Sequence, residues 1–176
     1  MDAEQLRAKQ LFTSYQGNTI RMHRAGEYEE YKSYQVSEQT EAEWIQEMID
    51  SYTKQCSIRD WEAVSHLESM ARDFKDPRIL NNVVRFASKH IMSADSVVKL
   101  MYVEHIINIV RSLKGVLSKE LLYETLHTSK QILDDIISKP LIIDPGHELV
   151  LYNMKDKRSL NLRANNSMEA LKSFLN

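Results

Sequence analysis

Polar side chains of the kinds found in active sites recur on one predicted helix in the first half of the chain. At 100° per residue, four of them fall within about 60° of one another beside an apolar face: Glu62, His66, Ser69 and Asp73. A carboxylate next to an imidazole can favour the protonated ring, or the two can supply ligands to a metal ion that other residues complete. The alternative is a solvent-exposed helix face with ordinary polar pairs, which surface helices carry routinely.

A second polar group lies on the most apolar segment of the chain. Glu104, Asn108 and Arg111 form a stripe along residues 94–114, which are otherwise mostly apolar. If this segment is a buried helix, these groups must pair with one another or with partners, because an unpaired buried charge is costly. The stripe indicates either a structural network or a polar site that lines a cleft or an oligomer contact.

A third group combines acidic and aromatic residues near the N-terminus. Residues 27–50 carry eight acids and one base, for a net charge of −7. The candidate binding residues within this segment are Glu29, Glu30, Tyr31 and Tyr34. Tyrosine is favoured at interfaces and fixed charge steers encounter, so this mixture suits the binding of a basic protein surface. The alternative is a solvated acidic face whose aromatic side chains point into the core.

The short motifs of nucleotide, zinc-protease and serine-nucleophile sites are absent from the sequence. It contains no GxGxxG, GxxxxGK[ST], HExxH or GxSxG. The sequence therefore assigns no cofactor and no metal site. A small basic loop, formed by Lys155, Lys157, Arg158 and Arg163, falls short of a nucleic-acid footprint in a chain of formal net charge −2.

The composition also bears on the compartment of the protein. Cys56 is the single cysteine, so no intramolecular disulfide is expected and no oxidising compartment is needed. The first residues lack the basic and apolar regions of a secretion signal. The most apolar window, 97–113, is interrupted by charged residues and is too polar for a membrane span, which needs about 20 predominantly apolar residues. These features predict a cytoplasmic protein without a membrane segment.

The elements that must position these groups are mainly helical. The chain has 4 Gly and 3 Pro, against the order of 12 and 9 that average usage would give, so turns are few and elements long. Caps and apolar periodicity predict helices at about 40–56, 60–75, 77–91, 94–114 and 119–138. The helix at 94–114 is apolar around nearly its whole circumference and must be surrounded. We expect an antiparallel bundle of about five core helices around this central helix.

The two ends of the chain have a different character. Residues 19–36 can be interpreted as two strands around a tight turn, and residues 147–163 as a second hairpin before a last short helix at about 166–174. The prediction is a single domain over residues 1–176. It comprises an N-terminal helix and hairpin region (1–36), a helical core (37–139) and a C-terminal hairpin with a short helix (140–176).

Two functions from different classes fit these features. The first is a cytoplasmic helical protein-interaction module, an adaptor, regulator or antagonist without an active site of its own. Its partner would be a protein, with a second copy of the chain (a homodimer) as the alternative. The second is a small metal-binding or hydrolytic helical-bundle enzyme that uses Glu62, His66 and Asp73. Binding to nucleic acid is the least favoured, and no membrane partner is expected.

Overall fold

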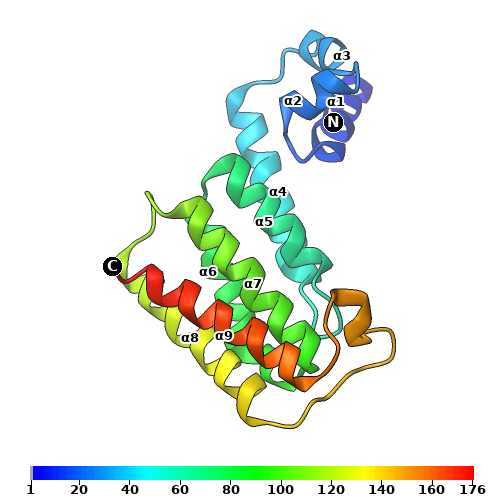
Figure 1. Ribbon diagram of the computed structural model, residues 1–176. Coiled ribbons are helices and arrows are strands. Elements are labelled where there is room, and N and C mark those ends of the chain that lie inside the picture. Colours follow the sequence, from blue (N-terminus) through cyan, green and yellow to red (C-terminus); the bar gives the residue numbers. More distant parts are fainter. Residues whose placement is uncertain (1) are drawn as a thin grey trace. The chain divides into compact units, whose positions relative to one another are not determined.

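The computed structural model describes residues 2–176, which form nine α-helices and two short 3-10 helices and contain no strand (Figure 1). The predicted mainly α fold is therefore confirmed. Contacts divide the chain into two compact units, of which the first reaches to Lys54 and the second covers Gln55–Asn176. The single domain over residues 1–176 and the antiparallel five-helix bundle stay predictions.

The first unit contains α1 (Ala3–Ser14), α2 (Thr19–Arg24), α3 (Tyr28–Ser33) and most of α4 (Glu38–Gln55). Its core is built around the buried ring of Phe12 on α1. The centroid of this ring lies 5.8 Å from that of Tyr31 and 5.5 Å from that of Trp44, at tilted angles. Aromatic pairs at such distances stabilise a core beyond the area they bury.

The hairpin predicted at residues 19–36 is not present, because helices α2 and α3 occupy this segment. The side chain of Asn18 accepts a hydrogen bond from the backbone N–H of Arg21 at 3.0 Å, which starts α2 as an N-cap. The three-residue spacing of Tyr28, Tyr31 and Tyr34 belongs to helical turns, and it places Tyr31 inward. Local capping therefore decides against the strands.

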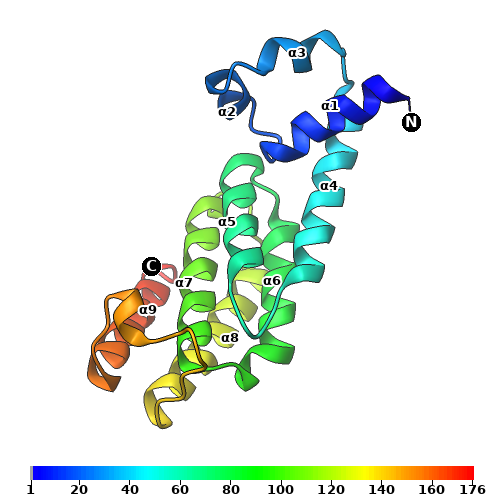
Figure 2. The same cartoon turned by 90° about the vertical axis from the view of Figure 1, so that its right-hand side faces the viewer.

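The second unit is organised around α7 (Ser96–Leu113). Thirteen residues of α7 are buried, from Ser96 to Leu113. α7 contacts α5 (Glu62–Phe74), α6 (Pro77–His90), α8 (Lys119–Ser138) and α9 (Lys157–Ser173), as the second view shows (Figure 2). Burial on nearly every side explains why the segment is apolar around its circumference.

Capping residues set the helix boundaries of the second unit. Asp76 caps α6 by accepting from the backbone N–H of Arg78, and Pro77 occupies the first turn, as the sequence predicts. Ser118 caps α8, which ends at Ser138 before Pro140. α7 begins slightly later than predicted, because Asp95 is its N-cap. The 3-10 helix η1 (Ile91–Ser93) separates α6 from this cap.

The hairpin predicted at residues 147–163 is also absent. Its first half contains the 3-10 helix η2 (Leu149–Tyr152), and its second half lies in α9. Asp156 and Ser159 form a reciprocal capping box, so α9 starts well before the predicted last helix at 166–174. Among the described residues, no helix has both the length and the apolar character needed to cross a bilayer.

Candidate functional site

A long connection between α8 and α9, residues 139–156, is the segment of the second unit with the least regular structure (Figure 1). We call it the arm. Connections longer than about 12–15 residues without structure of their own are uncommon and are usually functional when they are ordered. Figure 1 shows the arm, in yellow and orange, at the end of the unit where α7 begins.

The arm exposes apolar side chains. Ile142, Val150 and Leu151 are 59%, 75% and 62% exposed, whereas Leu149 and Met154 point inward and are buried. Loops of this length usually present polar side chains to solvent. The outward apolar residues therefore distinguish the arm from an ordinary connection.

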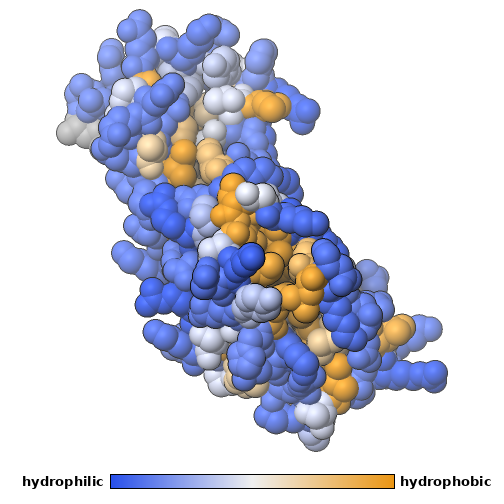
Figure 3. All heavy atoms as spheres, turned by 90° about the vertical axis from the view of Figure 1, so that its left-hand side faces the viewer, coloured by the Kyte–Doolittle hydropathy of each residue, from blue (hydrophilic) through white to orange (hydrophobic). Residues whose placement is uncertain are grey.

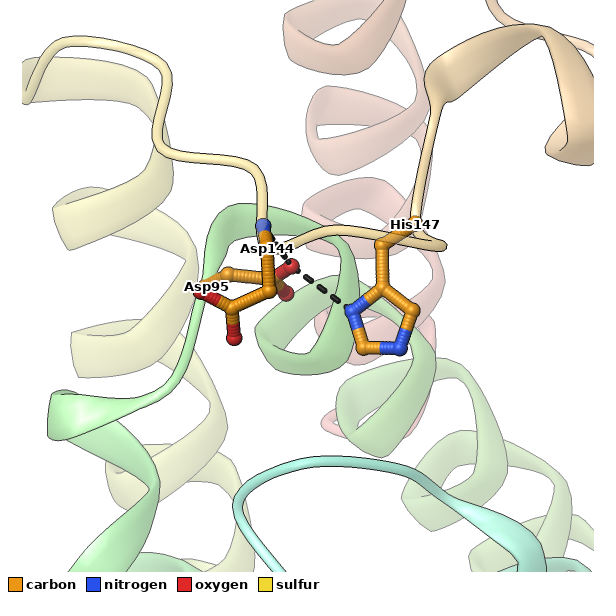
Figure 4. Close-up of side chains that lie close together, drawn as sticks. All are labelled: Asp95, Asp144 and His147. Atoms are coloured by element: carbon orange, nitrogen blue, oxygen red, sulfur yellow. Dashed lines mark hydrogen bonds and ion pairs between the residues drawn. The ribbon is translucent and has the colours of Figure 1, made fainter.

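A buried carboxylate at the start of α7 holds the first half of the arm. One oxygen of Asp95, Oδ1, accepts from the backbone N–H of Val98 at 2.8 Å and so caps α7. Its Oδ2 accepts from the backbone N–H of Asp144 at 2.9 Å and from Nδ1 of His147 at 2.8 Å (Figure 4). The Asp95 side chain has no exposed surface, so these bonds replace its contact with water. We call Asp95, Asp144 and His147 the latch.

Ser96 extends the latch along the arm. Its backbone N–H donates to the carbonyl oxygen of Ile142 at 2.9 Å, and its Oγ accepts from the Ile142 backbone N–H at 3.0 Å. Ile142 is thus bound through both backbone groups while its side chain stays in solvent. The start of α7 therefore fixes the arm through polar groups, and the apolar side chains are left available.

Aromatic stacking supports the middle of the arm. The Trp61 ring, just before α5, lies 5.4 Å from the ring of His147 and 5.2 Å from that of Tyr152, the latter edge-on. The His147 side chain is 14% exposed as a result. Trp61 thereby limits the rotation of both rings and keeps the imidazole directed at Asp95.

The predicted stripe on α7 holds the other end of the arm. Glu104 binds the guanidinium of Arg163, on α9, through two bonds, Nε–Oε1 at 2.5 Å and Nη2–Oε2 at 2.8 Å. A third guanidinium nitrogen, Nη1, donates to the carbonyl oxygen of Tyr152 at 2.8 Å. Planar bidentate pairs of this kind fix orientation as well as distance. Sequence spacing did not indicate the Arg163 contact.

The other two residues of the stripe lie beside this pair. A shallow hollow of about 360 Å³ between α7 and α9 is lined by Glu104, Asn108, Arg111 and Arg163, among others. The Arg111 guanidinium donates to Asn108 at 3.2 Å, and Asn108 donates to the carboxylate of Glu68 at 3.4 Å. The stripe therefore forms part of a polar network that joins three helices, α5, α7 and α9.

Glu68 and His105 form a half-buried pair in the same network, with Nδ1 and Oε2 separated by 2.5 Å. Burial raises the pKa of the Glu68 carboxyl, but the hydrogen bond and charge of His105 outweigh it and hold the pKa below its ordinary value. This pair links α5 to α7. The two residues are 37 positions apart, so their spacing in the sequence did not indicate this contact.

The candidate enzyme residues lie on α5, as predicted, and none of them is buried: Glu62 is exposed, and His66, Ser69 and Asp73 are partly exposed. Nε2 of His66 is 4.0 Å from Oε1 of Glu62, and both side chains are exposed. Ser69 accepts a hydrogen bond from Arg72, and Asp73 is half-buried near the end of the helix. This arrangement matches the helix-spaced polar pairs considered as the alternative.

The acidic and aromatic candidates mainly make contacts inside the first unit. Glu30 binds Arg7 through two bonds of 2.7 and 3.1 Å, and Tyr34 donates to the same carboxylate at 3.1 Å. Tyr31 is buried and its hydroxyl donates to Glu41 at 2.5 Å. Glu29 is exposed on α3. Glu30 and Tyr31 therefore link α3 to α1 and α4, and Tyr34 supports the Glu30 carboxylate.

Hydrophobic side chains also reach the surface on another face of the second unit. They gather on the face drawn in Figure 3, on the side where α6 and α8 lie in Figure 1. At the start of α8, Val116 and Tyr123 are exposed, and three leucines are half-buried: Leu117, Leu121 and Leu122. This surface is an alternative to the arm as a place where a partner could bind.

Comparison with known proteins adds nothing to this geometry. No protein family, no curated protein and no solved structure matches the chain.

Proposed function

We propose that the chain is a protein-interaction module, an adaptor, regulator or antagonist, and that the arm is its binding surface. One observation carries this proposal: a segment that is held in place by buried polar contacts presents aliphatic side chains to solvent. The polar side chains of Asp95 and His147 are enclosed, whereas the apolar side chains of Val150 and Leu151 face solvent. Exposed apolar side chains on an ordered scaffold are a common feature of interaction sites.

The energetics favour recognition by this surface. Complete burial of an aliphatic side chain is worth about 1.5–3 kcal/mol, so Ile142, Val150 and Leu151 together offer a substantial driving force. Association costs less when the binding segment is already ordered, because fewer side chains and backbone angles are fixed on binding. The latch, the Trp61 ring and the Arg163 contacts supply that order.

The partner that fits the arm is a protein with an apolar pocket. Charges of both signs flank the exposed aliphatic residues, with Asp144 and Glu148 on one side and Lys155 and Arg158 on the other. A nucleic-acid surface would require an excess of bases to contact phosphates. The cytoplasmic location stays a prediction from the sequence. The enzyme alternative is less supported, because Glu62 and His66 are exposed.

Charge substitutions on the arm test the proposal. Affinity capture from a lysate of the source cells, with proteins identified by mass spectrometry, would compare the wild type with a Val150→Asp, Leu151→Asp double variant. The matched control is Ile20→Asp, since Ile20 is 64% exposed and lies in the first unit. We expect specific proteins to be lost from the double variant and retained by the control.

Three further results would change the conclusion. Light scattering that shows a wild-type dimer and a monomeric double variant would identify a second copy as the occupant of the arm. Recovery of the same proteins by the wild type and by the double variant would show that the arm is not the binding surface. Loss on Val116→Asp alone would then assign the function to the surface at the start of α8.

A further inference from the structure

The latch brings together three side chains that are common metal ligands. Asp95, Asp144 and His147 each offer one ligand atom, and these atoms all lie within 4.8 Å of one another (Figure 4). We propose that the latch is a binding site for a divalent transition-metal ion of the zinc class. Binding of the ion does not depend on what the arm recognises.

The distances are close to those of a metal site. Nδ1 of His147 and Oδ2 of Asp95 are 2.8 Å apart and share one proton. Two ligands held at about 2.0–2.1 Å in a tetrahedral zinc site lie about 3.3 Å from each other. A cation that replaces the shared proton therefore needs these two groups to separate by only about 0.5 Å. The ring then binds as the neutral tautomer with its proton on Nε2: a protonated ring releases its Nδ1 proton to water, and a neutral ring moves that proton to Nε2 through solvent.

The surroundings hold two of the ligands in place before the ion arrives. The backbone N–H groups of Val98 and Asp144 fix the Asp95 carboxylate, and the Trp61 ring restricts His147. Metal sites depend on such supporting contacts, which orient the ligands. Asp144 lies in the exposed turn before Gly146 and can complete the set by a side-chain rotation.

The local charge favours a cation. The positive end of α7 offsets part of the charge of Asp95. Within residues 2–176, the Asp144 carboxylate makes no hydrogen bond or ion pair, and neither aspartate pairs with a lysine or arginine. Two adjacent carboxylates therefore have His147 as a neighbour but no lysine or arginine partner among the described residues, and a divalent ion would supply positive charge.

The ligand types select the class of ion. One imidazole nitrogen and two carboxylate oxygens suit zinc and its neighbours in the first transition row, whereas magnesium and calcium prefer oxygen ligands throughout. Three protein ligands leave one position for water, since Asp144 is at the surface. Once bound, the ion would link residues 144 and 147 of the arm to the start of α7.

Metal titration of the intact chain tests this proposal. Protein stripped with a chelator and dialysed would be titrated with zinc chloride in competition with a chromophoric chelator, and with cobalt chloride while the visible spectrum is followed. We expect one zinc per chain and cobalt absorption bands typical of a site with nitrogen and oxygen ligands. Asp144→Asn and His147→Gln should each weaken binding at least about tenfold.

The controls separate a built site from chance binding. Asp144 is exposed, so Asp144→Asn leaves the helical circular-dichroism spectrum unchanged and loss of zinc binding cannot come from misfolding. His66→Gln removes the exposed pair with Glu62, which is the obvious place for an adventitious ion, and should leave the affinity unchanged. Zinc binding lost in His66→Gln but retained in Asp144→Asn would overturn the proposal. Absence of binding at 1:1 stoichiometry in the wild type would also overturn it.

Discussion

Replacing Asp95 with asparagine separates the two tasks of this side chain. Asparagine is as good an N-cap as aspartate, so its amide oxygen can still accept from Val98 and start α7. Its amide nitrogen cannot accept from Asp144 or His147, both of which donate to Oδ2 in the wild type. Asp95→Asn should therefore release residues 144–147 of the arm and leave α7 intact, while the contacts of Ser96 and Arg163 with the arm remain.

The size of the effect follows from the lost hydrogen bonds. A hydrogen bond to a charged acceptor contributes about 1.5–3 kcal/mol, so two of them give about 3–6 kcal/mol. Because about 1.4 kcal/mol corresponds to a factor of ten, local opening should become at least about 100-fold more frequent. The exposed position of Asp144 lets water solvate the released groups, so the loss is local to the arm.

Hydrogen–deuterium exchange followed by mass spectrometry measures this opening. Peptides from residues 141–154 should exchange faster in Asp95→Asn, by at least about 100-fold at the Asp144 amide that loses its acceptor, and peptides from the middle of α7 should not change. The matched control is Asp76→Asn, which alters the N-cap of α6 but touches no part of the arm. Unchanged exchange of residues 141–154 in Asp95→Asn would refute the reasoning.

Three more predictions concern buried groups. Lys99→Ala removes one of the two lysines that pair with the buried carboxylate of Asp135, whose Oδ2 lies 2.6 Å from Nζ of Lys99, and leaves Lys139 as its basic partner. Urea unfolding should show a loss of about 1.5–3 kcal/mol, and an unchanged free energy of unfolding would contradict this. Burial raises the pKa of the Asp135 carboxyl, but hydrogen bonds from two lysines hold it below the ordinary 3.8, and the Arg78 hydrogen bond likewise lowers the pKa of Asp76. The stabilisation by the Asp135 and Asp76 carboxylates is present above pH 3.8 and is lost as the pH falls through the lowered pKa values of the folded protein. The urea midpoint of unfolding should therefore decrease below about pH 4. A urea midpoint that does not change with pH in this range would contradict the prediction. Burial raises the pKa of the Cys56 thiol from 9.0 to about 11, so the reactive thiolate is about 100-fold rarer at pH 8 in the folded chain. A thiolate of higher pKa is also a better nucleophile, which offsets part of this difference. Iodoacetamide at pH 8 should therefore modify Cys56 at least about tenfold more slowly in the folded chain than in the unfolded chain. Equal rates would contradict the burial of Cys56.

Local sequence signals predicted the helices of the second unit well. Capping residues and prolines determine a helix boundary within one turn of the chain. The structure confirms the start of α6 at the Asp76-Pro77 pair, the start of α8 after Ser118, and the end of α8 before Pro140. Apolar residues on nearly all sides of the helix predicted at 94–114 indicated that it is buried, because a helix that is surrounded by others needs no polar face.

The two predicted hairpins were wrong for a physical reason. Short runs of alternating residues resemble strands, but the side chains of Asn18 and Asp156 satisfy the first N–H groups of a helix. A single capping contact of this kind starts a helix, and it outweighs a weak alternation over a few residues. The apparent strands at 19–36 and 147–163 are therefore largely helical.

The latch could not be predicted from spacing. Asp95 is separated in the sequence from its partners Asp144 and His147 by 49 and 52 residues. Glu104 is separated from Arg163 by 59 residues. Such contacts depend on how helices pack, which no short window of sequence specifies. The available signals were an aspartate before an apolar helix and the Asp-Pro-Gly-His turn, which together mark a cap and a tight turn but not their contact.

The most direct test of the central claim compares what three forms of the chain bind. The claim is that the latch holds the arm so that its exposed aliphatic side chains bind a protein. Affinity capture with the wild type, Asp95→Asn and the Val150→Asp, Leu151→Asp double variant should recover specific proteins only with the wild type. The first variant releases the segment 144–147 that precedes the exposed aliphatic residues, and the second removes the apolar surface itself. Recovery of the same proteins by all three forms would contradict the account.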